Sequence, residues 1–252
     1  MRVVGCLAAV LALSIVAPAF AQDQEWDEYT SIQDGFTVDM PGKPQVQTTT
    51  WTSQYRYVLP ARVYTANHGA EKYSVTVVDY RPAEKLGEER FKQCPKGAET
   101  CLGTQDGRNG DIIGLGYWKM DVRGAMTFAM LKILQRDPAA KLTDMNLQFQ
   151  QVVEGYFLQL TNPDGSHTFD YITMHENRLY IFEGMTPKGY PVGDLFQSSV
   201  GFVDKDGNQI RYTDYYSNTI HGLRQYVPPP AGLTPPDGDF TKRTVGEVHL
   251  AN

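Results

Sequence analysis

The stretch FDYITMHENRLYIF, residues 169–182, predicts two short β-strands joined by a tight turn. The turn falls on Glu176 and Asn177, and asparagine tolerates the left-handed backbone that a two-residue hairpin loop needs. Apolar, aromatic and β-branched side chains fill most positions on either side of it, which is typical of strands. We therefore expect the rest of the fold to be organised around an antiparallel hairpin.

A two-residue turn also fixes which residues of the two strands face each other. Because successive strand residues point to opposite faces, the register shows that both faces of the hairpin are largely apolar. A half-solvated sheet would be apolar on one face only, so we expect a sheet that is covered on both sides. The expected pairs are Met174–Leu179, Ile172–Ile181 and Asp170–Glu183 on one face, and Thr173–Tyr180 and Tyr171–Phe182 on the other.

The hairpin lies within a longer pattern that spans residues 152–203. An alternating strand and an Asn162-Pro163-Asp164-Gly165 turn precede it, and a short helix with Asp194 placed to cap it follows. The whole pattern predicts one α+β domain, residues 26–218, built as an antiparallel β-sheet flanked by helices. Further strands are expected at 36–40, 45–51, 62–65, 73–80 and 142–149, and a helix at 83–93. Another helix is expected behind Asp121, which is placed as its N-cap, and its apolar residues from Val122 to Leu134 form a core-facing stripe.

The first 21 residues have the pattern of a secretory signal peptide. Arg2 supplies the positive charge, residues 7–16 form an apolar core too short to span a bilayer, and Ala19-Phe20-Ala21 fits a cleavage site. We therefore expect cleavage between Ala21 and Gln22 and a periplasmic or secreted protein. No later segment is apolar enough to cross a membrane, so the mature chain is expected to have no transmembrane segment.

The charge balance limits the partners of the protein. The chain has 23 basic and 29 acidic residues, and removing Arg2 leaves 22 − 29 = −7. A mildly acidic domain without a basic cluster argues against binding to nucleic acid or to anionic membrane surfaces.

Two cysteines remain after the signal peptide is removed, Cys94 and Cys101. Export places them in an oxidising compartment, and Pro95, Lys96 and Gly97 between them favour a turn. Their spacing is not C-x-x-C and no histidine lies nearby, which argues against a redox or metal pair. The sequence therefore predicts a small structural disulfide.

Searches for catalytic and cofactor motifs find none that is complete. His175-Glu176 begins like a zinc-protease motif, but position 179 is leucine and the pair lies at a hairpin. Gly114-Leu115-Gly116 lacks the third glycine of a dinucleotide site. The histidines show no metal-ligand spacing, so we expect no catalytic residues, no cofactor and no metal.

Asp170 and Glu183 are the exception, because the hairpin register places these two carboxylates opposite each other. Like charges in that position destabilise a hairpin. The pair is a candidate for binding a cation or for sharing a proton in acid–base work. The alternatives are that a neighbouring Arg or Lys neutralises the pair, or that both residues lie at the wet end of the sheet.

The C-terminal residues 219–252 are rich in proline and predict a flexible tail. Four tyrosines crowd into the transition to this tail: Tyr212, Tyr215, Tyr216 and Tyr226. Tyrosine favours interfaces, since it combines a large contact area with a polar tip, so one hypothesis is a protein-contact segment. The alternative is that the rings pack on their own sheet and the tail is a linker.

Three stretches carry a resemblance to known proteins. FTVDMPGKP at 36–44 resembles the opening F-x-V-x-x-P-G-x-P of secreted bacterial domains, and RLYIFE at 178–183 with LFQSSVGF at 195–202 resembles their closing strand and helix. These domains are similar to the PsbP-like fold. The resemblance implies an antiparallel sheet between helices and a non-enzymatic accessory or assembly role, with no catalytic residues to carry over.

Three functions remain open at this point. The first is an exported, non-catalytic periplasmic binding or accessory module whose ligand is unknown. The second is an enzyme or cation-binding protein that uses Asp170 and Glu183. The third is a cell-envelope interaction factor that uses the tyrosine- and proline-rich segment. The partner is accordingly an unknown envelope protein or a small ligand.

Overall fold

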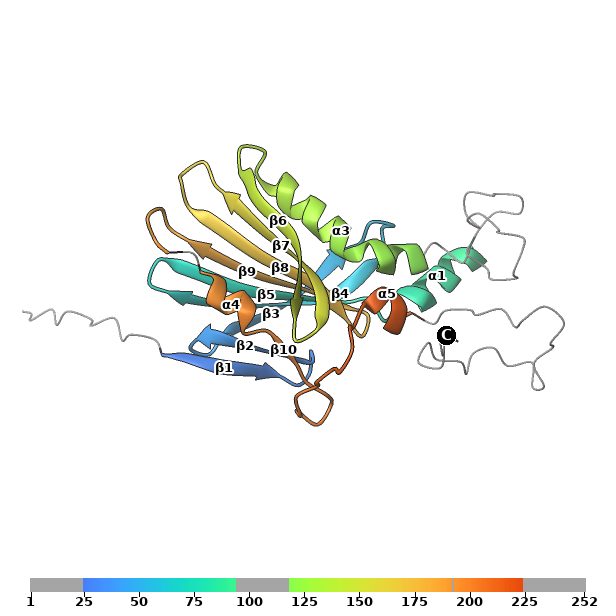
Figure 1. Ribbon diagram of the computed structural model, residues 1–252. Coiled ribbons are helices and arrows are strands. Elements are labelled where there is room, and N and C mark those ends of the chain that lie inside the picture. The colour runs from blue at the N-terminus through green and yellow to red at the C-terminus, as the bar shows by residue number, and fades with distance from the viewer. Residues whose placement is uncertain (1–24, 94–117, 192, 224–252) are drawn as a thin grey trace, which may run out of the picture.

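The computed structural model describes residues 25–93, 118–191 and 193–223. These residues form two antiparallel sheets and a few helices (Figure 1). The seven-stranded sheet has the order β3 (Gln45–Thr52), β4 (Val58–His68), β5 (Glu71–Asp79), β9 (Arg178–Thr186), β8 (His167–His175), β7 (Val153–Thr161), β6 (Lys141–Gln150). The three-stranded sheet has the order β1 (Trp26–Ser31), β2 (Phe36–Pro41), β10 (Gly201–Phe202), and the helices are α1 (Ala83–Lys92), α3 (Trp118–Arg136), α4 (Asp194–Ser198) and α5 (Asn218–His221).

The β8–β9 hairpin has the register that its turn predicted. Asp170 pairs with Glu183, Ile172 with Ile181 and Met174 with Leu179, and the pairs on the opposite face also agree. Glu176 and Asn177 form the turn with φ values of 48° and 57°, the left-handed geometry of a two-residue loop. Every residue from 168 to 175 is buried, which confirms that this part of the sheet is covered on both sides.

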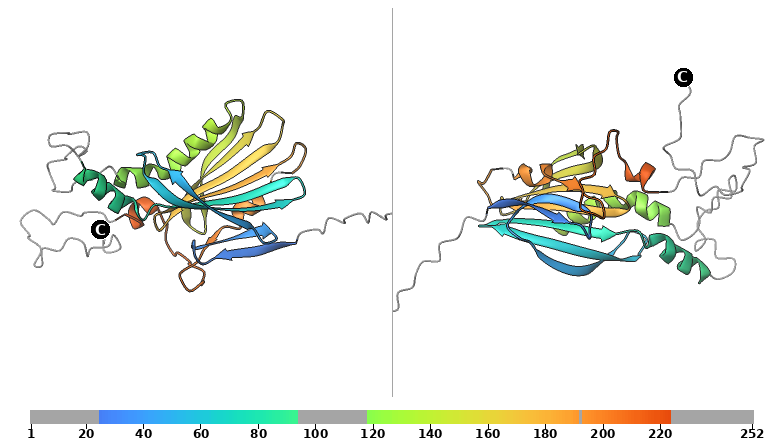
Figure 2. Two further views of the ribbon diagram at one scale, coloured as in Figure 1. Left: turned by 180° about the vertical axis from the view of Figure 1, so that it is seen from behind. Right: turned by 90° about the horizontal axis from the view of Figure 1, so that it is seen from below.

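Helix α3 covers one face of the large sheet (Figures 1 and 2). Val122, Ala125, Ala129 and Ile133 are buried along its inner side and belong to the same core as Leu158 of β7. These helix residues recur at the three- and four-residue spacing of one helical face. The apolar stripe of α3 is therefore core, as the pattern predicted.

The opposite face is covered mainly by the small sheet, together with α4. Phe36 and Val38 of β2, Phe196 of α4 and Phe202 of β10 are all buried in one core with Phe182 of the large sheet. The α+β class is confirmed, but helices alone do not flank the sheet. The strand predicted at 36–40 is observed as β2. It forms part of this second layer, because it pairs with β1 and β10 instead of joining the large sheet.

The prediction that Asp121 caps a helix was wrong. Helix α3 begins at Trp118, so Asp121 lies inside its first turn, and its side chain is fully buried. Its carboxylate accepts a hydrogen bond from the backbone N–H of Tyr55 at 3.3 Å, and burial raises its pKa. Asp121 therefore fastens the start of α3 to the turn between β3 and β4.

The segment after β10 packs on the tip of the β8–β9 hairpin. Tyr216 is buried and bridges Val153 in parallel, and its hydroxyl accepts a hydrogen bond from the backbone N–H of Glu176 at 2.9 Å. Asn177 donates through Nδ2 to the carbonyl oxygen of Gly222 at 2.5 Å, and Leu223 is buried in the core beneath α3. Packed residues therefore continue to Leu223.

Candidate functional site

A cavity of about 400 Å³ lies where the small sheet, the β4–β5 hairpin and the α4 region meet. Its deep surface is Tyr73 of β5 and Phe196 of α4, both buried, and its outer wall is Trp26 of β1, which is 38% exposed. In Figure 1 the three parts of the chain lie together at the end of the molecule where β1 begins. We call this the aromatic cavity; its remaining lining residues are Asp39, His68, Glu71, Pro191, Gly193 and Leu195.

The polar side of the aromatic cavity is acidic. Glu71 accepts a hydrogen bond from Nδ1 of His68 at 2.8 Å, and its side chain is 14% exposed. The hydroxyl of Tyr73 also lies against Glu71, and burial together with this carboxylate raises the pKa of Tyr73 to about 12. Asp39 adds a second, exposed carboxylate. The described lining residues therefore combine aromatic rings with two carboxylates and include neither Lys nor Arg.

Sequence reasoning did not find this cavity. Its rings and carboxylates come from β1, β2, the β4–β5 hairpin and α4, and none of these segments carries a motif on its own. A contact between β2 and the end of the α4 region joins Asp39 and Ser199, whose Oγ accepts a hydrogen bond from the Asp39 backbone N–H at 2.9 Å across 160 residues of chain. Only the pairing of the small sheet brings these segments together.

The structure does bring together Asp170 and Glu183, and it adds Arg136. The two carboxyl groups face the α3 side of the sheet, on the same face as Ile172 and Ile181. Arg136, in the last turn of α3, donates to Oε2 of Glu183 at 2.5 Å. A neighbouring arginine therefore neutralises Glu183, which is the arrangement that one of the alternatives anticipated.

Asp170 is in a different state from Glu183. It is fully buried, and neither carboxyl oxygen accepts a hydrogen bond from a donor in the described residues. Burial, and then the nearby charge of Glu183, raise the pKa of Asp170 well above 3.8. Both effects favour the protonated form of Asp170, because they oppose a second negative charge beside Glu183. The pair shares one proton, and Arg136 balances the remaining charge.

Replacing Asp170 with Asn should flatten the dependence of stability on pH. A folded-state pKa above the unfolded value gives a contribution that is fully present below the unfolded pKa and is lost as pH rises through the folded pKa. Asn stays neutral at every pH, so it removes this contribution. Over a series from pH 5 to pH 9, the melting temperature of the Asp170→Asn variant, relative to the unmodified protein, should therefore rise with pH and level off once the pH has passed the folded-state pKa of Asp170.

The matched control is Asp144→Asn, at an exposed carboxylate of β6, whose difference in melting temperature should not change over this range. If the melting temperatures of Asp170→Asn and of the unmodified protein changed in the same way with pH, this result would contradict the shared proton. The cation hypothesis remains a prediction, and the same measurement tests it. It requires calcium to raise the melting temperature of the unmodified protein but not of Asp170→Asn/Glu183→Gln.

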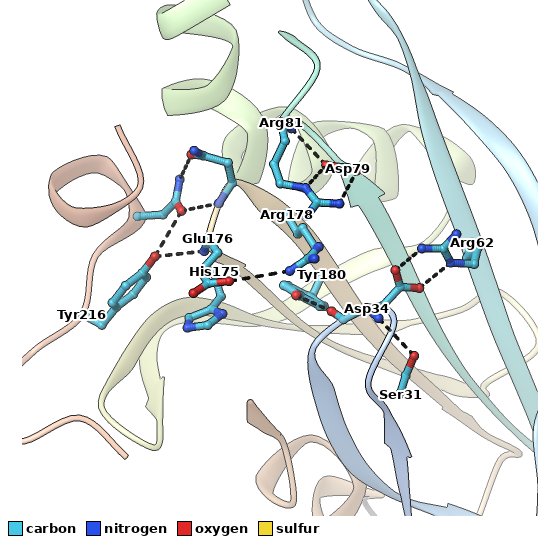
Figure 3. Close-up of polar contacts among 12 residues, drawn as sticks. Ser31, Asp34, Arg62, Asp79, Arg81, His175, Glu176, Arg178, Tyr180 and Tyr216 are labelled. Atoms are coloured by element: carbon cyan, nitrogen blue, oxygen red, sulfur yellow. Dashed lines mark hydrogen bonds and ion pairs between the residues drawn. The ribbon is translucent and has the colours of Figure 1, made fainter. Parts of the chain in front are cut away.

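A second polar cluster joins the two sheets. Figure 3 shows Asp34, from the β1–β2 turn, between Arg62 of β4 and Tyr180 of β9. Arg62 donates to both carboxylate oxygens of Asp34, with Nε at 2.6 Å from Oδ2, and Tyr64 donates to Oδ2 at 2.5 Å. The Tyr180 hydroxyl donates to the carbonyl oxygen of Asp34 at 2.7 Å. Since Asp34 is buried, we interpret this cluster as the polar clamp of the fold.

The C-terminal tyrosines lie partly inside the domain. Tyr216 is buried, and Tyr212 is half-buried with its hydroxyl 2.6 Å from Nε2 of His175. Burial lowers the pKa of His175 to about 3, so this histidine is neutral at physiological pH. Tyr215 stays 42% exposed. Tyr226, Cys94 and Cys101 lie outside the described residues, so the disulfide and the contact segment remain predictions.

A smaller cavity, of about 310 Å³, lies beside this segment. Its lining is mostly polar, with Gln151, Gln209 and Arg211 next to Val152 and Tyr212. It has one aromatic ring and no carboxylate among these residues. The aromatic cavity is therefore the stronger candidate for a built binding site.

The described residues form antiparallel sheets with a few helices, and an aromatic, acidic cavity lies at one end. No family model matches the chain, and no curated protein matches it. Among solved structures, the chain is similar to cyanobacterial PsbP (CyanoP) from Synechocystis sp. PCC 6803, whose structure was determined in solution. The match covers 79% of this chain and 99% of that chain, with 15% identity and a TM-score of 0.40.

Proposed function

We propose that this protein is an exported, non-catalytic binding module that holds a small molecule in the aromatic cavity. The cavity itself is the observation that carries the proposal. Its volume of about 400 Å³ lies within the range of roughly 300–1,000 Å³ that small-molecule sites occupy. Mostly apolar and aromatic walls with a few convergent polar groups are also typical of such sites.

The carboxylate pair gives less support to an enzyme. A general acid or base has to reach the substrate directly or through one water molecule. Asp170 is fully buried, and neither cavity described above is lined by Asp170 or Glu183. Binding therefore explains the described residues better than acid–base catalysis does.

Export is the part of the proposal that rests on the sequence. The signal-peptide pattern in residues 1–21 is its basis, and no helix in the described segments is long and apolar enough to cross a membrane. The resemblance to PsbP-like domains implies a non-enzymatic accessory role, which agrees with a binding module.

A protein-contact function has one observation in its favour. Edge strand β6 exposes Met145, Leu147 and Phe149, and the ring of Phe149 lies 4.9 Å from that of Tyr215. Exposed apolar side chains that gather in this way commonly mark interaction surfaces. A protein that binds the tyrosine-rich segment would therefore be able to contact Tyr215 and the exposed side chains of β6.

Ligand-observed NMR with a mixture of small cationic, neutral and anionic compounds tests the binding function. We expect a subset of the compounds to bind the unmodified protein and to lose binding in Trp26→Ala, because this change removes the outer wall of the cavity. Tyr190→Ala is the matched control, since Tyr190 is an exposed aromatic residue next to the lining residue Pro191. Compounds that bind equally to all three proteins would show that the cavity is not the site.

A further inference from the structure

We propose that the aromatic cavity selects an organic cation of the quaternary ammonium class, such as a choline-like head group. This inference rests on the proposed binding function and names its ligand. Recognition of such cations uses aromatic faces arranged around the charge, within about 6 Å of the ring centroids. The aromatic cavity offers that arrangement together with negative charge.

The rings that line the cavity pack against one another at steep angles. Trp26 and Tyr73 are 4.8 Å apart, centroid to centroid, with an interplanar angle of 79°. Tyr73 and Phe196 are 5.2 Å apart at 54°. Rings in contact at these angles give the lining a continuous aromatic surface, of which Trp26 is the part most exposed to an incoming ligand.

The charged residues that line the aromatic cavity favour a cation. Glu71 and Asp39 both line the cavity, whereas no Lys or Arg is among its lining residues in the described part of the chain. The cation–π contacts of the described chain lie elsewhere, for example Arg90 over Tyr57 and Lys132 over Trp51. Asp39 is exposed, so at least this carboxylate can attract a positive charge from solvent.

The hydrogen bonds of the lining favour a ligand that needs few of them. Nδ1 of His68 donates to Glu71, and the hydroxyl of Tyr73 also lies against this carboxylate. A sugar would require several free donors and acceptors, because its hydroxyl groups lose water on entering the cavity. A quaternary ammonium group has no N–H to satisfy and loses little by being surrounded by rings. The contacts that Glu71 already makes with His68 and Tyr73 therefore favour a quaternary ammonium group over a sugar.

Isothermal titration calorimetry with choline and 3,3-dimethylbutan-1-ol tests the inference on the full chain. The two compounds have the same shape, but only choline carries the charge. Choline should bind at least about tenfold more tightly, since cation–π and carboxylate attraction act on it alone. Glucose and acetate serve as neutral, hydrogen-bonding and anionic probes, and both should bind more weakly than choline.

Three substitutions separate the sources of affinity. Trp26→Leu removes a ring and should weaken choline binding by about tenfold. Glu71→Gln and Asp39→Asn each remove one charge and should weaken it by roughly threefold to tenfold, with little effect on the alcohol. Asp27→Asn is the matched control, because Asp27 follows Trp26 on β1 and points to the opposite face of the strand. Asp39 is exposed, so its variant keeps the test valid if the Glu71 variant does not fold.

The possible outcomes distinguish the two proposals. Equal affinity for choline and the alcohol, or choline affinity unchanged in Trp26→Leu and Asp39→Asn, would overturn the cation site. If glucose or acetate binds more tightly than choline and loses affinity in Trp26→Leu, the ligand class is wrong and the binding function stands. If no probe binds and the mixed compounds give no Trp26-dependent signal either, both proposals fail.

Discussion

Replacing Arg62 with Met is expected to lower the free energy of unfolding by about 3–5 kcal/mol, because it leaves a buried carboxylate without its positive partner. The side chain of Asp34 is only 3% exposed, whereas that of Arg62 is 26% exposed. Arg62 gives Asp34 a two-pronged contact that fixes the β1–β2 turn against the large sheet. Tyr64 would still donate to Oδ2 of Asp34, but a neutral donor cannot balance its charge. Urea denaturation followed by circular dichroism measures the change.

Replacement of the other partner, Asp34, is the control, because the side chains of Asp34 and Arg62 differ in exposure. Asp34→Asn leaves Arg62, which can be rehydrated from its exposed side, so we expect a loss of only about 1–2 kcal/mol. The double variant Asp34→Asn/Arg62→Met should recover most of the stability that Arg62→Met loses, since no unpaired charge remains. A loss below about 1 kcal/mol in Arg62→Met would contradict the interpretation of this cluster as a buried polar clamp.

The central hairpin could be predicted from the sequence because the information that sets it is local. Glu176 and Asn177 determine the turn, the turn determines the register, and the register determines that Asp170 faces Glu183. Alternation of side chains along the strands then shows that both faces are buried. No step in this chain of inference depends on a distant residue.

The second layer and the aromatic cavity depend on contacts between segments far apart in the chain, which local sequence patterns do not predict. The strand at β2 was predicted, but its partners were not, since β10 lies far along the chain and pairs through only Gly201 and Phe202. The same holds for Arg136, which reaches Glu183 because α3 ends at that point of the sheet. Trp26 and Phe196 carry no motif that links them, so the cavity becomes visible only in three dimensions.

Asp121 shows how a correct local pattern led to a wrong role. An aspartate before an apolar helical stripe is typical of an N-cap. Here the helix starts earlier, at Trp118, and the carboxylate instead accepts a hydrogen bond from the β3–β4 turn. The choice between cap and tertiary contact depends on what packs beside the helix, which periodicity along the chain does not describe.

Gly155→Ala is the second substitution with a large expected effect. A Cβ atom at Gly155 of β7 would lie 2.5 Å and 2.6 Å from two ring carbons of Tyr171 on β8. Tyr171 is fully buried, and its hydroxyl donates to the carbonyl oxygen of Val153 at 3.0 Å. The ring therefore lies directly over the glycine, and no side chain fits beneath it. Strand glycines often mark a close approach of this kind.

The expected loss is about 3–4 kcal/mol, from overpacking together with at least one broken hydrogen bond of Tyr171. This corresponds to a decrease in melting temperature of roughly 10 °C for a domain of this size. Gly184→Ala is the matched control on strand β9, which is separated from β7 by β8, and there the added Cβ would meet its nearest atoms at 3.3 Å and 3.4 Å. Those atoms belong to the side chains of Gln197 and Tyr73, and a shift of a few tenths of an ångström relieves the contact.

A double variant shows whether the ring of Tyr171 is the cause. Tyr171→Leu alone should be destabilising, because it removes buried aromatic surface and the hydrogen bond to Val153. Adding Gly155→Ala to it should then cost much less than in the unmodified protein, since the smaller side chain leaves room for the new methyl group. If the two losses add without interaction, the methyl group is accommodated in another way, and the close packing of Tyr171 on Gly155 does not limit the stability of the sheet.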